Sequence, residues 1–550
     1  MFVRRIGRKD GSTVVRIVEN IRCGDQIKQK VLLTVGRASS REDVIQLESE
    51  AKNKIVELYN ERNPVLPGFE HMIYGENLPE KHETSEAQEL VDIKQIREEK
   101  RINTGIEDVF GSIYSQLDFE DLIKGTRKDE QWNDILKQVI FSRILQPSSK
   151  RKVSQRVAKD LNQEIQLEKI YRMMDRLVEN EEAIKKRVFN SSMSLLNYEV
   201  DVLFFDVTTL YFESFDEDEL RRFGFSKDCK FKETQVVLAL VTNNRGVPLT
   251  YELFPGNQYE GHTLIEIIKK LKESYQVKNV VMVSDRAMFN EENLTFMEEN
   301  GIRYVVAAKL KSMTKEIQEK FLDTHYCPLD GWVKDLPIAE RRLIVSYSTL
   351  RAKKDYKQRM RLVERLMKKA KDGKINVKSL INNNGTKKYI QVTQGEARLN
   401  EEKIIQDSLW DGIHGVITNY KQDEQTAQDV LEKYKGLWKI EEVFRINKND
   451  LQMRPIYHWR PDRIRAHILI CFIAYTMVNF AGHTLEKQKL KISFDELKYQ
   501  LSKREISIIR DRLTQRRYMI HSEFTDLQKQ IYRSFMLPIK ESIEPMFRVS

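Results

Sequence analysis

Two aspartates stand where apolar, strand-like runs of the sequence end. Asp206 follows the run LFF, and Asp285 closes the run VVMVS. Ligands gather at strand ends in open α/β sheets, and two carboxylates on neighbouring strands can share hard divalent cations through oxygen ligands. The plainer alternatives are an Asx-turn beginning at Asp206 and a helix cap at Asp285.

A third carboxylate, Glu441, lies in the segment YKGLWKIEEVFRINK, which has helical periodicity. In a regular helix of about 100° per residue, Tyr434 lies roughly 20° from Glu441, and Arg445 and Lys448 lie within about 40° of it. A metal-binding carboxylate beside a phenol and two cations suits phosphoryl transfer, because the cations and the phenol can position neighbouring phosphates. The alternative is a Glu441–Arg445 surface ion pair worth only about 0.2–0.5 kcal/mol.

These segments also carry a family resemblance. FFDVTTL, VSDRAMF and YKGLWKIEEVFRINK resemble the catalytic motifs of DDE transposases of bacterial insertion sequences, in the branch with a Tyr, Arg, Glu, Lys signature. Tyr434, Glu441 and Lys448 match this signature, whereas Leu437 stands at the position of its arginine. The resemblance covers most of the chain, from MFVRR through FSRILQPSSK to RPIYHWRPDRIRAHILICFIA. It implies an RNase H-like catalytic core.

The resemblance further implies an in-line displacement at phosphorus that uses two Mg²⁺ ions, or Mn²⁺ in their place. Water frees the 3′ end of the element, and this 3′-OH then attacks target DNA. The residues expected to hold the metal are Asp206, Asp285 and Glu441, and those expected at DNA phosphates are Tyr434, Lys448 and Arg445.

The implied partners are double-stranded DNA, as terminal inverted repeats and as target, and a second copy of the chain in a homodimeric DNA complex. No membrane is expected, and the predicted location is the cytoplasm, in association with the bacterial nucleoid. Relatives release the second strand through a hairpin on the element end, which requires an aromatic wedge for an unstacked base. Trp332 and Trp410 are candidates, with a place in the core as the alternative.

Two other functions remain compatible with the same residues. One is a catalytically inactive protein that binds DNA ends, which the departure at Leu437 favours and the intact carboxylates oppose. The other is an RNase H-like nuclease without strand transfer, for which the segments outside the core would be superfluous.

Composition is that of a globular protein with a polyanionic partner. The 550 residues are 40% hydrophobic and 32% charged, with a net charge of +10, so disorder is excluded and nucleic-acid binding is plausible. The four cysteines have no CxxC spacing, which argues against a zinc site. We expect no signal peptide, and we interpret the apolar stretch 468–480 as a buried helix, because it is too short to span a membrane.

Periodicity predicts an α/β protein whose core runs in the order βββαβαβ. The basic stretch 351–374, with 11 Lys and Arg against 3 Asp and Glu, is interpreted either as a phosphate-binding surface or as a solvated helix face. The predicted parts are a β-hairpin and helix module (1–62), a polar connector (63–105), a helical, DNA-binding domain (106–198), the RNase H-like core (199–308 and 412–482), an inserted β-rich and basic segment (309–411) and a helical C-terminal tail (483–550).

Overall fold

The computed structural model divides the chain into two units, and each is described here by itself. One unit comprises residues 1–103, 503–525 and 539–550, and the other comprises residues 104–502 and 526–538. The structure describes residues 2–546 except 9–11, 24–25, 41–42, 45, 49, 53, 56–92, 161–164, 197–201, 214–215, 225–232, 260–261, 276–280, 287–289, 323–328, 372–388, 394–395 and 542.

The first unit contains two antiparallel sheets. The N-terminal sheet has the order β1-β2-β3 (Phe2–Gly7, Thr13–Cys23, Gln26–Ala38), and its core is built on Val15 and Ile17. Here the chain forms a third strand beyond the predicted hairpin. The second sheet has the order β17-β16-β15-β4, from strands Ile543–Met546, Arg517–His521, Glu505–Asp511 and Ile96–Asn103.

This second sheet corrects two predictions. The tail 483–550 is not purely helical, since it contributes β15, β16 and β17 as well as helices α16 (Phe494–Ser502) and α17 (Asp526–Ser534). The connector 63–105 ends in strand β4, which pairs antiparallel with β15. The strand IREEKRIN has five charged residues between its isoleucines, so its β-structure comes from this distant partner and not from its own periodicity.

The second unit begins with a layer of helices that surrounds α15 (Pro461–Lys487). Helices α2, α3, α5 and α6 all pack against α15, whose side chains are buried on every face. Among the described residues, α15 is the one helix long and apolar enough to cross a membrane, and 78% of its most apolar window is buried inside the protein. The helices of this layer are α2 (Gly105–Gln116), α3 (Asp129–Leu145), α4 (Lys150–Asp160), α5 (Leu167–Glu179) and α6 (Glu181–Leu196).

A large mixed sheet forms the rest of this unit, with eight strands in the order β10-β11-β14-β9-β8-β5-β6-β7. Strands β5, β8 and β9 are parallel to one another, and the other neighbours are antiparallel. The predicted order βββαβαβ is present as β5 (Val202–Tyr211), β6 (Gln235–Asn243), β7 (Pro248–Pro255), α7 (Thr263–Tyr275), β8 (Val281–Ser284), α8 (Glu291–Glu299) and β9 (Arg303–Ala307).

The segment 309–411 extends this sheet and adds a small hairpin. Strands β10 (Val333–Ile338) and β11 (Arg341–Tyr347) continue the sheet past β14 (Ile413–Thr418), whereas β12 (Ile390–Thr393) and β13 (Glu396–Leu399) pair only with each other. The helices of this segment are α9 (Lys315–Leu322), α10 (Thr349–Lys371) and α12 (Glu401–Ser408).

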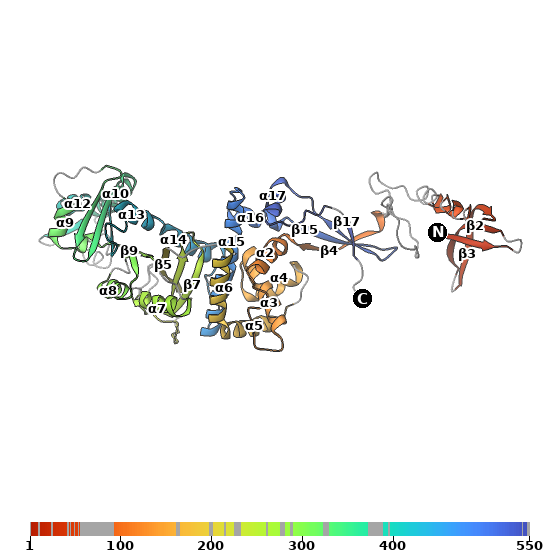
Figure 1. Ribbon diagram of the computed structural model, residues 1–550, viewed down its shortest axis with the longest axis horizontal. Coiled ribbons are helices and arrows are strands. Elements are labelled where there is room, and N and C mark those ends of the chain that lie inside the picture. The colour runs from red at the N-terminus through yellow and green to blue at the C-terminus, as the bar shows by residue number, and fades with distance from the viewer. Residues whose placement is uncertain are drawn as a thin grey trace. The chain divides into compact units, whose positions relative to one another are not determined.

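Helices cover both faces of the sheet (Figure 1). Helices α7 and α8 lie on one side, and α13 (Ala427–Lys435) and α14 (Trp438–Arg445) lie on the other. The sequence predicted one continuous helix here. It is instead interrupted at Gly436 and Leu437, and residues Ile446–Asp450 form a π-helical turn.

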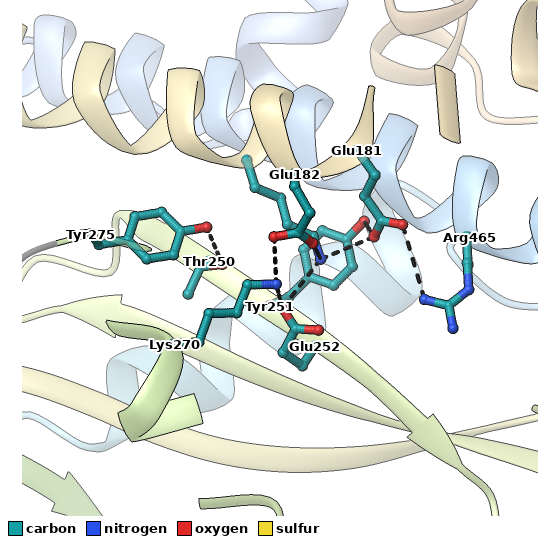
Figure 2. A network of polar contacts seen from close by, with 9 residues as sticks. Glu181, Glu182, Thr250, Tyr251, Glu252, Lys270, Tyr275 and Arg465 are labelled. Atoms are coloured by element: carbon teal, nitrogen blue, oxygen red, sulfur yellow. Dashed lines mark hydrogen bonds and ion pairs between the residues drawn. The ribbon is translucent and has the colours of Figure 1, made fainter. Parts of the chain in front are cut away.

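A buried network of charges joins the helical layer to the sheet (Figure 2). The ammonium of Lys185 on α6 is 1% exposed and lies 3.0 Å from Glu181, 3.1 Å from Glu182 and 3.3 Å from Glu252 on β7. It also lies 4.3 Å from the centre of the Tyr251 ring. Burial alone would lower the pKa of Lys185, but the carboxylates of Glu252, Glu181 and Glu182 reverse this and raise it.

Candidate active site on strand β5

Asp206 and Asp285 lie side by side on neighbouring parallel strands. In the register of β5 and β8, Phe205 is the partner of Ser284, so the next residue of each chain is a predicted carboxylate. Neighbouring strands are about 4.8 Å apart. Because side chains alternate along a strand, both carboxylates lie on the face of the sheet opposite to Phe205 and Ser284.

The local structure differs from the turn and cap expected as alternatives. Asp206 lies inside β5, which continues to Tyr211, rather than at a strand end. Its Oδ1 accepts a hydrogen bond from the Val207 N–H at 2.8 Å. Asp285 directly follows β8 and accepts the Arg286 N–H at 2.6 Å, whereas the cap of α8 is Asn290.

Glu441 lies in a segment that contacts β5 at two points. Gly436 lies against the ring of Phe204, and Lys448 donates a hydrogen bond to the hydroxyl of Thr208. Phe204, Asp206 and Thr208 share one face of the strand because side chains repeat every second residue. The segment therefore covers the face that carries Asp206, and the exposed Glu441 lies between its two fixed points.

Tyr434 lies near carboxylates from two different elements. Its ring packs against His414, with 4.9 Å between the ring centres and 38° between the ring planes. Burial raises the pKa of the Tyr434 phenol, and the nearby charges of Asp285 and Glu441 raise it further. The hydroxyl is therefore protonated at neutral pH and can donate a hydrogen bond to a phosphate oxygen.

The two predicted cations have different surroundings. Lys448 reaches β5 from the π-helical turn, so the regular spacing assumed from the sequence ends before it. Arg445 is 55% exposed and pairs with Glu442 at 3.6 Å and with Asp450 at 3.4 Å. The surface ion pair considered for Glu441 and Arg445 is thus formed by Glu442 and Arg445. Leu437, at the signature position for arginine, is buried with 8% exposure.

Four residues near this site were missed by the sequence argument. Arg286 follows Asp285 directly, so its place beside a predicted carboxylate was a usable signal. Trp438 is 57% exposed and lies three residues before Glu441 on α14. This spacing in the sequence was also a usable signal. His414 and Arg351 come from β14 and α10, and no local pattern connects either residue to the carboxylates.

Trp332 and Trp410, the suggested aromatic wedges, belong to a hydrophobic cluster in the segment 309–411. Both pack against the buried residues around Phe321, Leu343 and Val345. Trp410 also meets the Phe321 ring edge-on at 5.9 Å. The structure therefore supports the core interpretation for both residues.

The donor set suits hard divalent cations, because all three predicted ligands offer carboxylate oxygens. Two of them, Asp206 and Asp285, are adjacent in the strand register. Within the part of the chain that the structure describes, no three His, Cys, Asp or Glu side chains lie close enough together to form a metal-binding group.

The comparison with known families covers the part of the chain that contains the sheet and its carboxylates. A family model described as the transposase DDE domain matches residues 199–477, about half of the chain. The chain therefore belongs to the DDE transposase family, whose members normally use divalent metal ions.

Two further comparisons add little. A solved structure described as the Mos1 transposase paired-end complex with left transposon end is 14% identical to the chain. The similarity covers 36% of this chain and 57% of the other, with a TM-score of 0.15. No curated protein matches the chain.

Proposed function

We propose that this protein is a transposase that cleaves DNA at the ends of its element and joins the freed 3′-OH to target DNA. The observation that carries the proposal is the register that makes Asp206 and Asp285 neighbours on β5 and β8. The strand order β7-β6-β5-β8-β9 supports an RNase H-like core, to which the segment 309–411 is an insertion.

Asp206, Asp285 and Glu441 are the proposed ligands of two divalent cations. Bound there, Mg²⁺ or Mn²⁺ would activate the attacking oxygen and stabilise the leaving oxygen of an in-line displacement. The Tyr434 hydroxyl and the Lys448 ammonium hold the flanking phosphates. Lys448 is already oriented by Thr208, which limits the rotamer entropy lost on binding. Arg445 stays a weaker candidate, because binding a phosphate would compete with its two acidic partners.

Helix α10 supports a role in binding the DNA backbone. Val363 and Leu366 bury one face of the helix, and Arg359 pairs with Asp411 at 2.6 Å. The opposite face carries exposed basic residues that make no ion pair with any described residue, so phosphates can neutralise them without displacing a partner. They are Lys353, Lys354, Lys357, Arg361, Arg365 and Lys368.

The remaining proposals follow from membership of the family. The helical region 106–198 reads the element's inverted repeats, a homodimer pairs the two ends, and the protein acts in the cytoplasm on the nucleoid. The buried Leu437 favours a second candidate, a protein that binds DNA ends without cutting them, because a cation is missing from the signature.

A cleavage assay separates these candidates. The purified protein is incubated with Mg²⁺, target plasmid and a labelled duplex carrying the inverted repeat that flanks its gene. We expect cleavage and joining by the wild type, and binding without cleavage by Asp206→Asn, Asp285→Asn and Glu441→Gln. Glu442→Gln, which changes the adjacent carboxylate, should cleave normally. Binding without cleavage by the wild type would establish the second candidate, and cleavage without joining would indicate a nuclease.

A further inference from the structure

Two arginines whose charges act on Tyr434 have no acidic partner among the described residues. Arg286 follows Asp285 at the end of β8, and Arg351 lies in the first turn of α10. Both are exposed. Neither guanidinium makes an ion pair or a hydrogen bond with a described residue. By contrast, Arg341 pairs with Glu298 at 2.7 Å and Arg359 pairs with Asp411 at 2.6 Å.

The backbone around Gly412 fixes the place of Arg351. The Ser348 N–H donates to the Gly412 carbonyl at 3.0 Å, and the Thr349 N–H donates to Asp330 at 2.6 Å, so the start of α10 is held at the start of β14. Gly412 has a φ of +78°, and a Cβ there would lie 2.7 Å from the Ser348 carbonyl oxygen. His414, which packs on Tyr434, is only two residues further along β14.

Electrostatics agree with this arrangement. Burial lowers the pKa of His414 to about 4, and the charges of Arg351 and Arg286 contribute to the shift. The same two arginines act on the Tyr434 phenol. His414 is thus neutral at physiological pH, and it supports the phenol without adding a third positive charge.

We propose that Arg286 and Arg351, together with the Tyr434 hydroxyl, bind a single phosphate of the DNA strand next to the one that is cut. The two guanidiniums offer only donors and two positive charges, and the phenol adds an O–H donor, which suits a phosphodiester and opposes a cation as the ligand. The pair supplies the positive charge that the buried Leu437 cannot provide. This inference rests on the proposed function.

The test combines arginine variants with neutralised phosphates. Binding of the full-length protein to the inverted-repeat duplex is measured by fluorescence anisotropy in Ca²⁺, with one methylphosphonate at each position within two nucleotides of the element's end. Arg351→Ala and Arg286→Ala should weaken binding about 10- to 100-fold, as expected for charge-assisted hydrogen bonds. At one position the methylphosphonate should weaken wild-type binding by a similar factor and leave the variants unaffected.

Arg97→Ala is the matched control, because Arg97 is exposed and makes no ion pair with a described residue; its affinity should equal that of the wild type. The inference is overturned if Arg351→Ala binds like this control, or if every methylphosphonate weakens the variant as much as the wild type. Cleavage in Mg²⁺ is scored separately. A wild type that never cuts would refute the proposed function, while the binding data would still decide whether the phosphate site exists.

Discussion

Gly436 lies so close to the ring of Phe204 that a Cβ would come within 2.4 Å of the ring's Cζ atom. Phe204 is only 1% exposed and cannot move aside. This contact sets the distance between β5 and the start of α14, and so the position from which Glu441 approaches Asp206.

The change Gly436→Ala should therefore damage activity more than stability. We expect overpacking to lower the free energy of unfolding by about 1–3 kcal/mol. A shift of about 1 Å in α14 should slow cleavage on the order of 100-fold. The control is Gly482→Ala in α15, where nothing lies within 4 Å of the added methyl group. That variant should be slightly stabilised and fully active, and equal activities of the two variants would contradict the argument.

Removal of the metal should separate binding from folding. The three proposed ligands are not needed for the core, so a chelator should abolish cleavage without unfolding the protein. Added Mg²⁺ should raise the thermal midpoint of the wild type, because a ligand that binds only the native state stabilises it. Asp206→Asn combined with Asp285→Asn should lose this rise. A rise of the same size in that double variant would place the cation elsewhere.

Lys185→Met should destabilise the protein strongly. The substitution leaves the carboxylates of Glu181, Glu182 and Glu252 without their shared cation (Figure 2). Breaking a buried ion pair in this way costs about 3–5 kcal/mol. Chemical denaturation measures the effect, and Lys186→Met, which changes the exposed neighbour, should stay within about 0.5 kcal/mol of the wild type. A small effect at Lys185 would mean that Lys270, which also contacts Glu252 and Glu182, neutralises the network alone.

Lys150→Met should have the opposite effect. The Lys150 ammonium is buried without a hydrogen-bond partner among the described residues, and burial lowers its pKa to about 7. Because the unfolded chain keeps its ordinary pKa near 10.5, the wild type gains stability as the pH rises from 7 to 10.5. The variant should exceed it by up to about 5 kcal/mol at low pH, where Lys150 is charged in both states. This advantage should shrink towards pH 10.5, and an advantage that does not change with pH would contradict the assignment.

The sequence predicted those parts of the site that depend on local patterns. The apolar runs before Asp206 and Asp285 indicated strands because their residues are buried on both faces of the sheet. Local patterns of apolar residues likewise predicted the order of strands and helices from β5 to β9. Glu441 and Tyr434 were found together because the interruption at Gly436 leaves the helical spacing between them nearly intact.

What the sequence could not predict depends on contacts between distant segments. The interruption at Gly436 reflects the ring of Phe204, more than two hundred residues away. Arg351 reaches the site through the anchoring of α10 at Gly412. Lys448 was assigned to the right strand face only by the structure, since the π-helical turn alters the regular spacing after Arg445. Periodicity carries no information about any of these contacts.

The pairing of β4 with β15 bears on how the protein is made. Residues 96–103 leave the ribosome long before residues 505–511, with about 400 residues of chain between the two strands. At a synthesis rate of about 5–20 residues per second, on the order of 20–80 s pass between the synthesis of β4 and that of its partner strand. The four-stranded sheet consequently closes only when synthesis is nearly complete. A prematurely terminated chain can contain all three carboxylates and still lack that sheet.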